Sequence, residues 1–266
     1  MPRRAIVKGA AAGALTCSAS RMTGVAVATG AGRAVSGDRF VVGDLEHIID
    51  DIIAPRPDVS GFGAEPFALQ SQSALQEVLD RGETVFEETR RDRWRRPVGR
   101  LINAQTGEPA EQWLVAIGAA RVRPASPFHD AIRNLLDSEK TARDARRGLW
   151  RLSTYQLLDA NDGAGWPRSK LRALTGQFHI GVGALASVAK RGRRIYFNFG
   201  ADYRSDFTAT FEGRTSEVEL ISGLDLATAA GDLVGRNVEV RGFLQAINGP
   251  SIALRHPLQI LARSAV

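Results

Sequence analysis

The sequence of 266 residues contains a single cysteine, Cys17, so no internal disulfide can form. No stretch reaches the roughly 18 apolar residues that a membrane-spanning helix needs. A Cys/His zinc pattern, a Gly-x-x-x-x-Gly-Lys phosphate loop and a Gly-x-Ser-x-Gly elbow are also missing. The sequence therefore gives no support to a disulfide scaffold, a spanning membrane protein or the enzyme classes that use these motifs.

The composition indicates a globular protein with a basic surface. Its hydrophobic fraction of 44% and charged fraction of 24% are ordinary for such proteins, and its length suits two domains. The net charge is +6, and six arginines lie between residues 90 and 100 around Trp94. Arginine suits phosphate groups and stacks on bases, so this cluster points to nucleic acid. The alternative is a solvated hairpin rim that only keeps the protein in solution.

The first 28 residues have the features of an export signal. Arg3 and Arg4 precede an alanine- and glycine-rich middle, and the triplet Ala26-Val27-Ala28 resembles a cleavage site. A twin-arginine signal of this kind would deliver the protein to the periplasm or outside the cell. The alternative is a disordered basic arm over residues 1–28.

The pattern over residues 32–151 predicts strands and three helices. A Gly43-Asp44 turn between apolar runs indicates a hairpin, and further strands are expected at 83–89 and 98–103. Apolar spacing predicts helices over residues 65–79, 113–121 and 128–147, the last ending at Gly148. The expected class is α+β, with strands predominating.

Several motifs in this region resemble the staphylococcal-nuclease, or thermonuclease, family. Ser36-Gly37-Asp38 is similar to its Asp-Gly-Asp motif, and Asp92 to Arg96 is similar to its Asp-Lys-Tyr-Gly-Arg stretch. Gly148-Leu149-Trp150 matches the close of the family pattern. The resemblance implies a five-stranded barrel of oligonucleotide-binding (OB) type with three helices over residues 32–151.

A second β-rich domain is expected at residues 176–266, after a linker at 152–175. Short strands with turns at Lys190 to Arg193 and Asn248 to Pro250 indicate a small barrel. This tail resembles the C-terminal unit of many proteobacterial thermonuclease-family proteins, which implies a second OB-like barrel. Such barrels bind single strands through basic and aromatic side chains, here Arg193, Arg194 and Tyr196. Phe197 and Phe199 are expected in its core.

The resemblance also implies which positions would carry catalysis. In the family, two aspartates and a carbonyl hold calcium, a glutamate activates water, and two arginines neutralise the phosphate. Asp38 and Arg96 occupy one aspartate and one arginine position. The other arginine, aspartate and glutamate fall on Ile48, Ile53 and Arg56. Ordinary nuclease activity is therefore not expected.

One rearrangement could rebuild part of the metal site. Asp51 shares a strand face with Ile53, and an altered register would bring it beside Asp38. Calcium would then bind Asp38 and Asp51; otherwise no cofactor is expected, and Asp51 faces solvent or pairs with an arginine.

The sequence thus predicts an exported thermonuclease-like protein with a degraded calcium site. It would act by binding nucleic acid or as an accessory subunit of a larger protein assembly. The alternative is a divergent metal-dependent nuclease that cleaves DNA or RNA with Asp38 and Arg96. The residues expected to bind nucleic acid are Arg91, Arg93, Trp94, Arg95, Arg96, Arg193, Arg194 and Tyr196.

Overall fold

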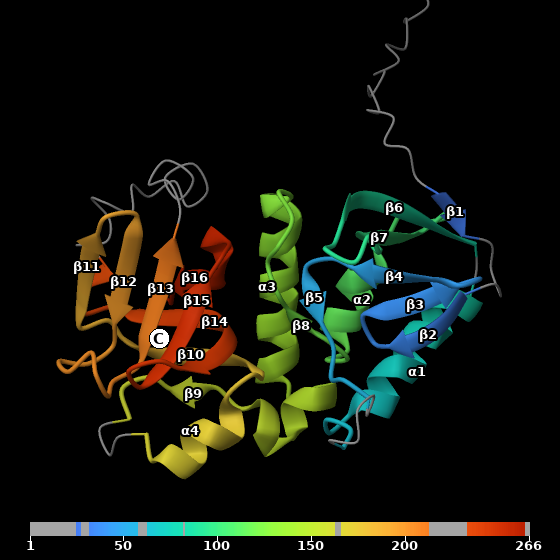
Figure 1. The fold of residues 1–266 in the computed structure, drawn as a ribbon. Helices are drawn as coiled ribbons and strands as arrows, with labels where there is room; N and C mark the ends of the chain where they lie inside the picture. The colour runs from blue at the N-terminus through green and yellow to red at the C-terminus, as the bar shows by residue number, and fades with distance from the viewer. Residues whose placement is uncertain are drawn as a thin grey trace, which may run out of the picture.

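The structure is a computed structural model, and it describes residues 25–27, 32–57, 63–81, 83–162, 166–212 and 233–263. These residues form a mixed α+β structure in which strands predominate, which confirms the predicted class (Figure 1). Two large sheets lie on opposite sides of helix α3, and each has its own apolar core.

The first sheet contains the strands that the Gly32 to Asn103 region was expected to supply. Its strand order is β1-β6-β7-β4-β3-β2. A separate short ladder pairs β5 with β8. The elements are β1 (Val25–Val27), β2 (Gly32–Ser36), β3 (Arg39–Val42), β4 (Leu45–Ile49), β5 (Ile52–Ile53), α1 (Ala68–Asp80), β6 (Thr84–Arg91), β7 (Pro97–Asn103), α2 (Ala110–Ala116), β8 (Arg121–Val122) and α3 (His129–Asp144).

Two tight turns connect β2, β3 and β4. Gly43 and Asp44 form the predicted two-residue hairpin turn, with Gly43 at φ +59° and Val42 paired to Leu45. At the other turn, a Cβ on Gly37 would lie 1.8 Å from the hydroxyl oxygen of Ser71 on α1. Only glycine permits this close approach, so the turn that carries Asp38 is held directly against α1.

The three predicted helices of this region are present, but α2 lies at Ala110–Ala116 and so begins and ends earlier than the predicted 113–121. Helix α2 ends at Ala116 because Gly118 adopts φ +72°, and the chain then enters β8 at Arg121. Helix α3 ends close to its predicted limit, and Gly148 adopts φ +51° after it. The amide of Leu149 donates to the carbonyl of Gly118 at 2.9 Å, which ties the end of α3 to the end of α2.

The second sheet is formed by the C-terminal part of the chain. Its strand order is β11-β12-β13-β15-β14-β10-β9, and β16 pairs with β14. Phe197 and Phe199 lie in its core, as predicted. The elements are β9 (Leu158–Asp159), α4 (Arg168–Leu174), β10 (Phe178–Ala184), β11 (Ser187–Arg191), β12 (Arg194–Asn198), β13 (Thr208–Glu212), β14 (Asn237–Ala246), β15 (Pro250–Leu254) and β16 (Ile260–Ala262).

The segment expected to link the two domains is attached to the second sheet. Within it, β9 pairs in parallel with β10. The side-chain amide of Asn161 donates to the carbonyls of Ala184 and Phe199 at 2.9 and 2.6 Å. These contacts fix Asn161 to the end of β10 and to Phe199, directly after β12.

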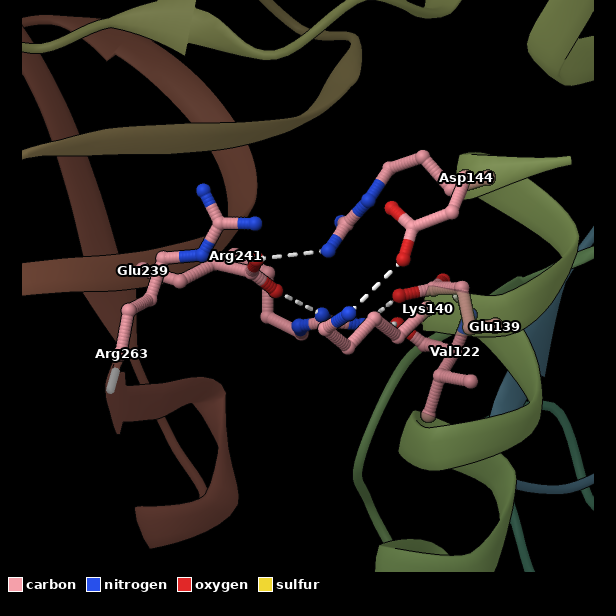
Figure 2. A network of polar contacts seen from close by, with 8 residues as sticks. Val122, Glu139, Lys140, Asp144, Glu239, Arg241 and Arg263 are labelled. Carbon is pink, nitrogen blue, oxygen red and sulfur yellow. Dashed lines mark hydrogen bonds and ion pairs between the residues drawn. The ribbon is translucent and has the colours of Figure 1, made fainter. Parts of the chain in front are cut away.

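The two sheets are joined by an apolar cluster and a buried ionic network. Ile53, Leu149 and Trp150 pack with Phe178 and Ile180 across the junction. Figure 2 shows the network, in which Arg241 of β14 reaches α3 and β8. Its guanidinium contacts Glu139 at 2.7 Å and the carbonyl of Val122 at 3.0 Å, and also pairs with Glu239.

The predicted export signal falls almost wholly outside the described residues. Only β1 is described, and it pairs antiparallel with β6. Across the described ranges, no helix combines the length and apolar character needed to cross a membrane.

Candidate functional site

Asp38, the retained acidic residue of the family pattern, lies in the turn between β2 and β3. Its side chain is buried, and its Oδ1 accepts a hydrogen bond from the hydroxyl of Ser36 at 2.6 Å. The Nε atom of Arg39 lies 3.8 Å from the same oxygen. These two neighbours hold the carboxylate in place. They also occupy the surroundings of Oδ1, the oxygen that both of them approach.

Arg96, at the family position of the second arginine by resemblance, lies directly before β7 and belongs to the same chain of charges. Its guanidinium binds Asp92 at 2.7 Å and Glu46 at 3.0 Å. Glu46 also lies 3.6 Å from Arg39, which contacts Asp38. Asp38 and Arg96 are therefore linked through Arg39 and Glu46.

The charges of this cluster do not suit a phosphate. Two arginines, Arg39 and Arg96, face three carboxylates, Asp38, Glu46 and Asp92, so the formal sum is +2 − 3 = −1. Burial alone would raise the pKa of Asp92, but the hydrogen bonds from Arg96 outweigh it and lower that pKa. Asp92 therefore stays ionised, and Arg96 is already neutralised where the family mechanism needs a free cation.

The three positions at which the resemblance implies a lost arginine, aspartate and glutamate have structural contacts in this protein. Ile48 lies opposite Arg39 in the β3–β4 hairpin and beside Val98 of β7. Ile53 packs in the apolar cluster that joins the two sheets. The Arg56 guanidinium binds Glu65 at 3.1 Å, and its amide donates to the same carboxylate. None of these side chains offers an acidic oxygen to a metal ion or a base to water.

Asp51, the residue that could have rebuilt the metal site, serves another part of the structure. It adopts φ +60°, and its Oδ1 accepts hydrogen bonds from the amides of Ala125 and Ser126, both at 2.8 Å. The Ser126 hydroxyl donates to Oδ2. Asp51 does not face solvent, and a calcium site with Asp38 would require it to release these three bonds. Within the described ranges, no three His, Cys, Asp or Glu side chains are grouped to hold a metal.

The arginine cluster forms the tip of the β6–β7 hairpin, and most of its members are paired. Four of them bind carboxylates: Arg90 binds Asp50, Arg91 binds Glu88, Arg96 binds Asp92 and Glu46, and Arg100 binds Glu111. Arg93 and Arg95 are exposed and form no ion pair with any described residue. These two arginines are therefore the cations of the tip that remain available to a phosphate.

Trp94, between these two arginines, is the most accessible aromatic side chain at the tip. It is 61% exposed, and the guanidinium of Arg93 lies 3.8 Å from its ring centroid. The Asp92 carboxylate accepts hydrogen bonds from the amides of Trp94 and Arg96, both at 2.9 Å, which fixes the turn. The exposed indole of Trp94 thus lies on an ordered turn, beside the unpaired guanidinium groups of Arg93 and Arg95.

The second predicted group of nucleic-acid-binding residues lies elsewhere. Arg193, Arg194 and Tyr196 lie in or beside the β11–β12 hairpin, at the opposite end of the molecule from β6 and β7 (Figure 1). Arg194 is paired with Glu212 at 2.8 Å. The structure does not bring the two groups onto one surface, so a joint binding groove is not formed.

Comparison with known proteins covers part of the first half of the chain, from the last residue of β4 to the end of α3 and the residues that follow it. Residues 49–152 match the family described as staphylococcal nuclease homologue, which relates the chain to that nuclease family. The matched segment begins after Asp38 and includes Asp51 and Arg96. No curated protein matches the chain.

The sequence interpretation overlooked Arg39 and Glu46, which link the two retained residues. Arg39 pairs with Ile48 across the hairpin, and Glu46 lies two residues before Ile48 on the same strand face. Diagonal neighbours in such a ladder are within reach of long side chains. The Gly43-Asp44 turn sets this register. The ion pair between Arg39 and Glu46 could therefore have been predicted from the hairpin.

Proposed function

We propose that this protein is a non-hydrolysing relative of the staphylococcal nucleases that binds single-stranded nucleic acid through the β6–β7 tip. The observation that carries the proposal is the turn at residues 93–95. There an exposed tryptophan lies between two exposed arginines that have no carboxylate partner among the described residues.

The proposed loss of hydrolysis is supported by the contacts of Arg96 and Asp51. Arg96 is neutralised by Asp92 and Glu46, and the carboxylate of Asp51 is bonded to the loop at Ala125 and Ser126. A missing base typically reduces the rate by about 10²- to 10⁴-fold, and a missing charge-stabilising donor by about 10²- to 10³-fold. Compared with the family pattern, the position of the base carries Arg56 and one of the two arginine positions carries Ile48.

Binding is supported by the chemistry of the tip. A base can stack on an indole at about 1–3 kcal/mol per base without regard to sequence. The exposed Arg93 side chain covers the Trp94 ring in the free protein, and it can move to a phosphate when a base takes its place. The expected ligand is therefore a short single strand, bound with little sequence preference.

Neutralising the free arginines should change the salt dependence of this binding. Each phosphate contact on a single strand contributes about −0.7 to the slope of log K against log salt. The variant Arg93→Gln/Arg95→Gln should therefore flatten the slope by about 1.4, and Trp94→Ala should weaken binding by about 1–3 kcal/mol. Fluorescence anisotropy with short DNA and RNA strands, titrated at several salt concentrations, measures both effects.

The matched control is Arg81→Gln, which removes an exposed arginine paired with Glu77 on α1. It should leave the slope unchanged. Because this control removes one charge and the double variant removes two, a slope change of about 0.7 in the control would show that only net charge matters. No measurable binding of the unmodified protein at low salt would reject the nucleic-acid proposal and favour an accessory role on another protein.

A further inference from the structure

A pocket of about 220 Å³ lies at the junction of the two halves of the chain. It is lined by residues 63–66 before α1, by Arg121 and residues 154–155, and by residues 177–179 at the start of the second sheet. Binding pockets for small molecules commonly form at such junctions, and most occupy about 300–1,000 Å³. The smaller volume here suits an ion or one end group of a larger molecule.

The main charged group of this pocket is Arg121, which is only 5% exposed. Its guanidinium lies 4.8 Å from the Tyr155 ring and 5.2 Å from the Phe178 ring, and it donates to the carbonyl of Phe178 at 2.6 Å. Its Nε has no hydrogen-bond partner, and no carboxylate lies within ion-pair distance among the described residues. A buried cation in this state lacks the anion that normally compensates its lost hydration.

The neighbours of Arg121 leave the pocket with a net positive charge. The Glu65 carboxylate also lines it, but Arg56 already holds that group at 3.1 Å. With Arg56, which lies outside the lining of the pocket, counted against Glu65, the three side chains sum to +2 − 1 = +1, so the charge of Arg121 remains. Burial and the charge of Arg121 lower the pKa of His179 to about 4, so this imidazole is neutral at pH 7 and adds no charge. Its Nε2 has no partner among the described residues.

We propose that this pocket binds a small oxyanion, in the form of a phosphate group, with Arg121 as the principal ligand. The guanidinium is planar and forms paired hydrogen bonds to such groups, and the two aromatic rings hold it in a fixed orientation. The residues of this pocket are separate from Asp38, Arg96 and the β6–β7 tip, so the inference does not depend on the proposed function.

Calorimetric titration of the full chain with inorganic phosphate, against chloride of equal ionic strength, tests this inference. The variant pair is Thr154→Glu and Thr154→Gln, because Thr154 lines the pocket and is exposed, so both variants should fold. The unmodified protein and Thr154→Gln should bind phosphate, whereas the added carboxylate of Thr154→Glu should weaken binding at least tenfold. Arg121→Lys should also bind more weakly, because lysine lacks the planar fork.

Two further titrations identify the source of the anion. A 5′-phosphorylated dinucleotide that competes with phosphate would indicate a strand end, and a failure to compete would indicate a free ion. The inference is overturned if the unmodified protein shows no phosphate binding. It is also overturned if Thr154→Glu and Thr154→Gln bind equally well, or if the unphosphorylated dinucleotide competes as strongly as the phosphorylated one.

Discussion

Replacing Arg241 by methionine should lower the free energy of unfolding by about 3–5 kcal/mol, the usual cost of breaking a buried ion pair. Arg241 and Glu139 are almost wholly buried, and Glu139 also accepts a hydrogen bond from the amide of Val122 at 2.6 Å. Burial alone would lower the pKa of Arg241, but Glu139 and Glu239 raise it. Without Arg241, the carboxylate of Glu139 would be buried with no ion-pair partner among the described residues, whereas Glu239 would keep Arg143 at 3.2 Å and Arg263 at 3.8 Å.

Urea denaturation of the variant measures this loss. The double variant Arg241→Met/Glu139→Gln removes both charges and keeps an acceptor for Val122, so it should regain most of the lost stability. Lys140→Ala removes the exposed pair with Asp144 on the same helix, and should change stability by less than about 1 kcal/mol. A change below about 1 kcal/mol for Arg241→Met would show that the network does not hold the two halves together.

Acidification should destabilise the protein through His179. Its folded-state pKa is lowered from an ordinary 6.5 to about 4, mainly because the ring is buried. Between pH 6.5 and 4 the unfolded chain takes up a proton that the folded chain does not, so stability falls as the pH falls through this window. The full effect is about 3 kcal/mol. The variant His179→Gln should lose that much less stability than the unmodified protein between pH 7 and 4.

The unmodified protein and the His179→Gln variant must be compared with each other at each pH, because Glu111 changes the free energy of unfolding with pH in the opposite direction. Burial raises the pKa of Glu111 to about 7, so its contribution to stability is present at low pH and is lost as the pH rises through 7. Urea titrations of both proteins at pH 7 and 4 separate the two contributions. Parallel pH dependence in the two proteins would contradict the assignment of a suppressed pKa to His179.

Local sequence signals predicted much of the fold. The Gly43-Asp44 turn placed the β3–β4 hairpin correctly, and apolar spacing with Gly148 placed α3 and its end. The end of α2 was misplaced, because apolar spacing continued to Ala120 while the backbone at Gly118 left the helix. Such errors arise where a single glycine outweighs the side-chain pattern.

The site was harder to predict because its contacts are distant in sequence. The position of Arg96 was expected, but its partner Glu46 lies 50 residues away. The role of Asp51 depends on the loop at Ala125 and Ser126, which is separated from it by more than 70 residues. Sequence spacing therefore identified the arginine cluster, whereas only the fold distinguished the paired arginines from Arg93 and Arg95.

The loss of the catalytic arrangement and the exposed tip at Trp94 together define the proposed role. Around Asp38 and Arg96, the carboxylates and guanidinium groups are paired with one another through Arg39 and Glu46. At the β6–β7 tip, by contrast, the Trp94 ring is exposed beside arginines without a carboxylate partner among the described residues. A protein of this kind should hold a strand without cutting it.

The most direct test is an incubation of the purified protein with single-stranded DNA and RNA in the presence of calcium, in which binding and cleavage are followed in the same sample. The account predicts that the strands are bound and remain intact. Calcium-dependent cleavage that disappears in the Asp38→Ala variant would contradict it.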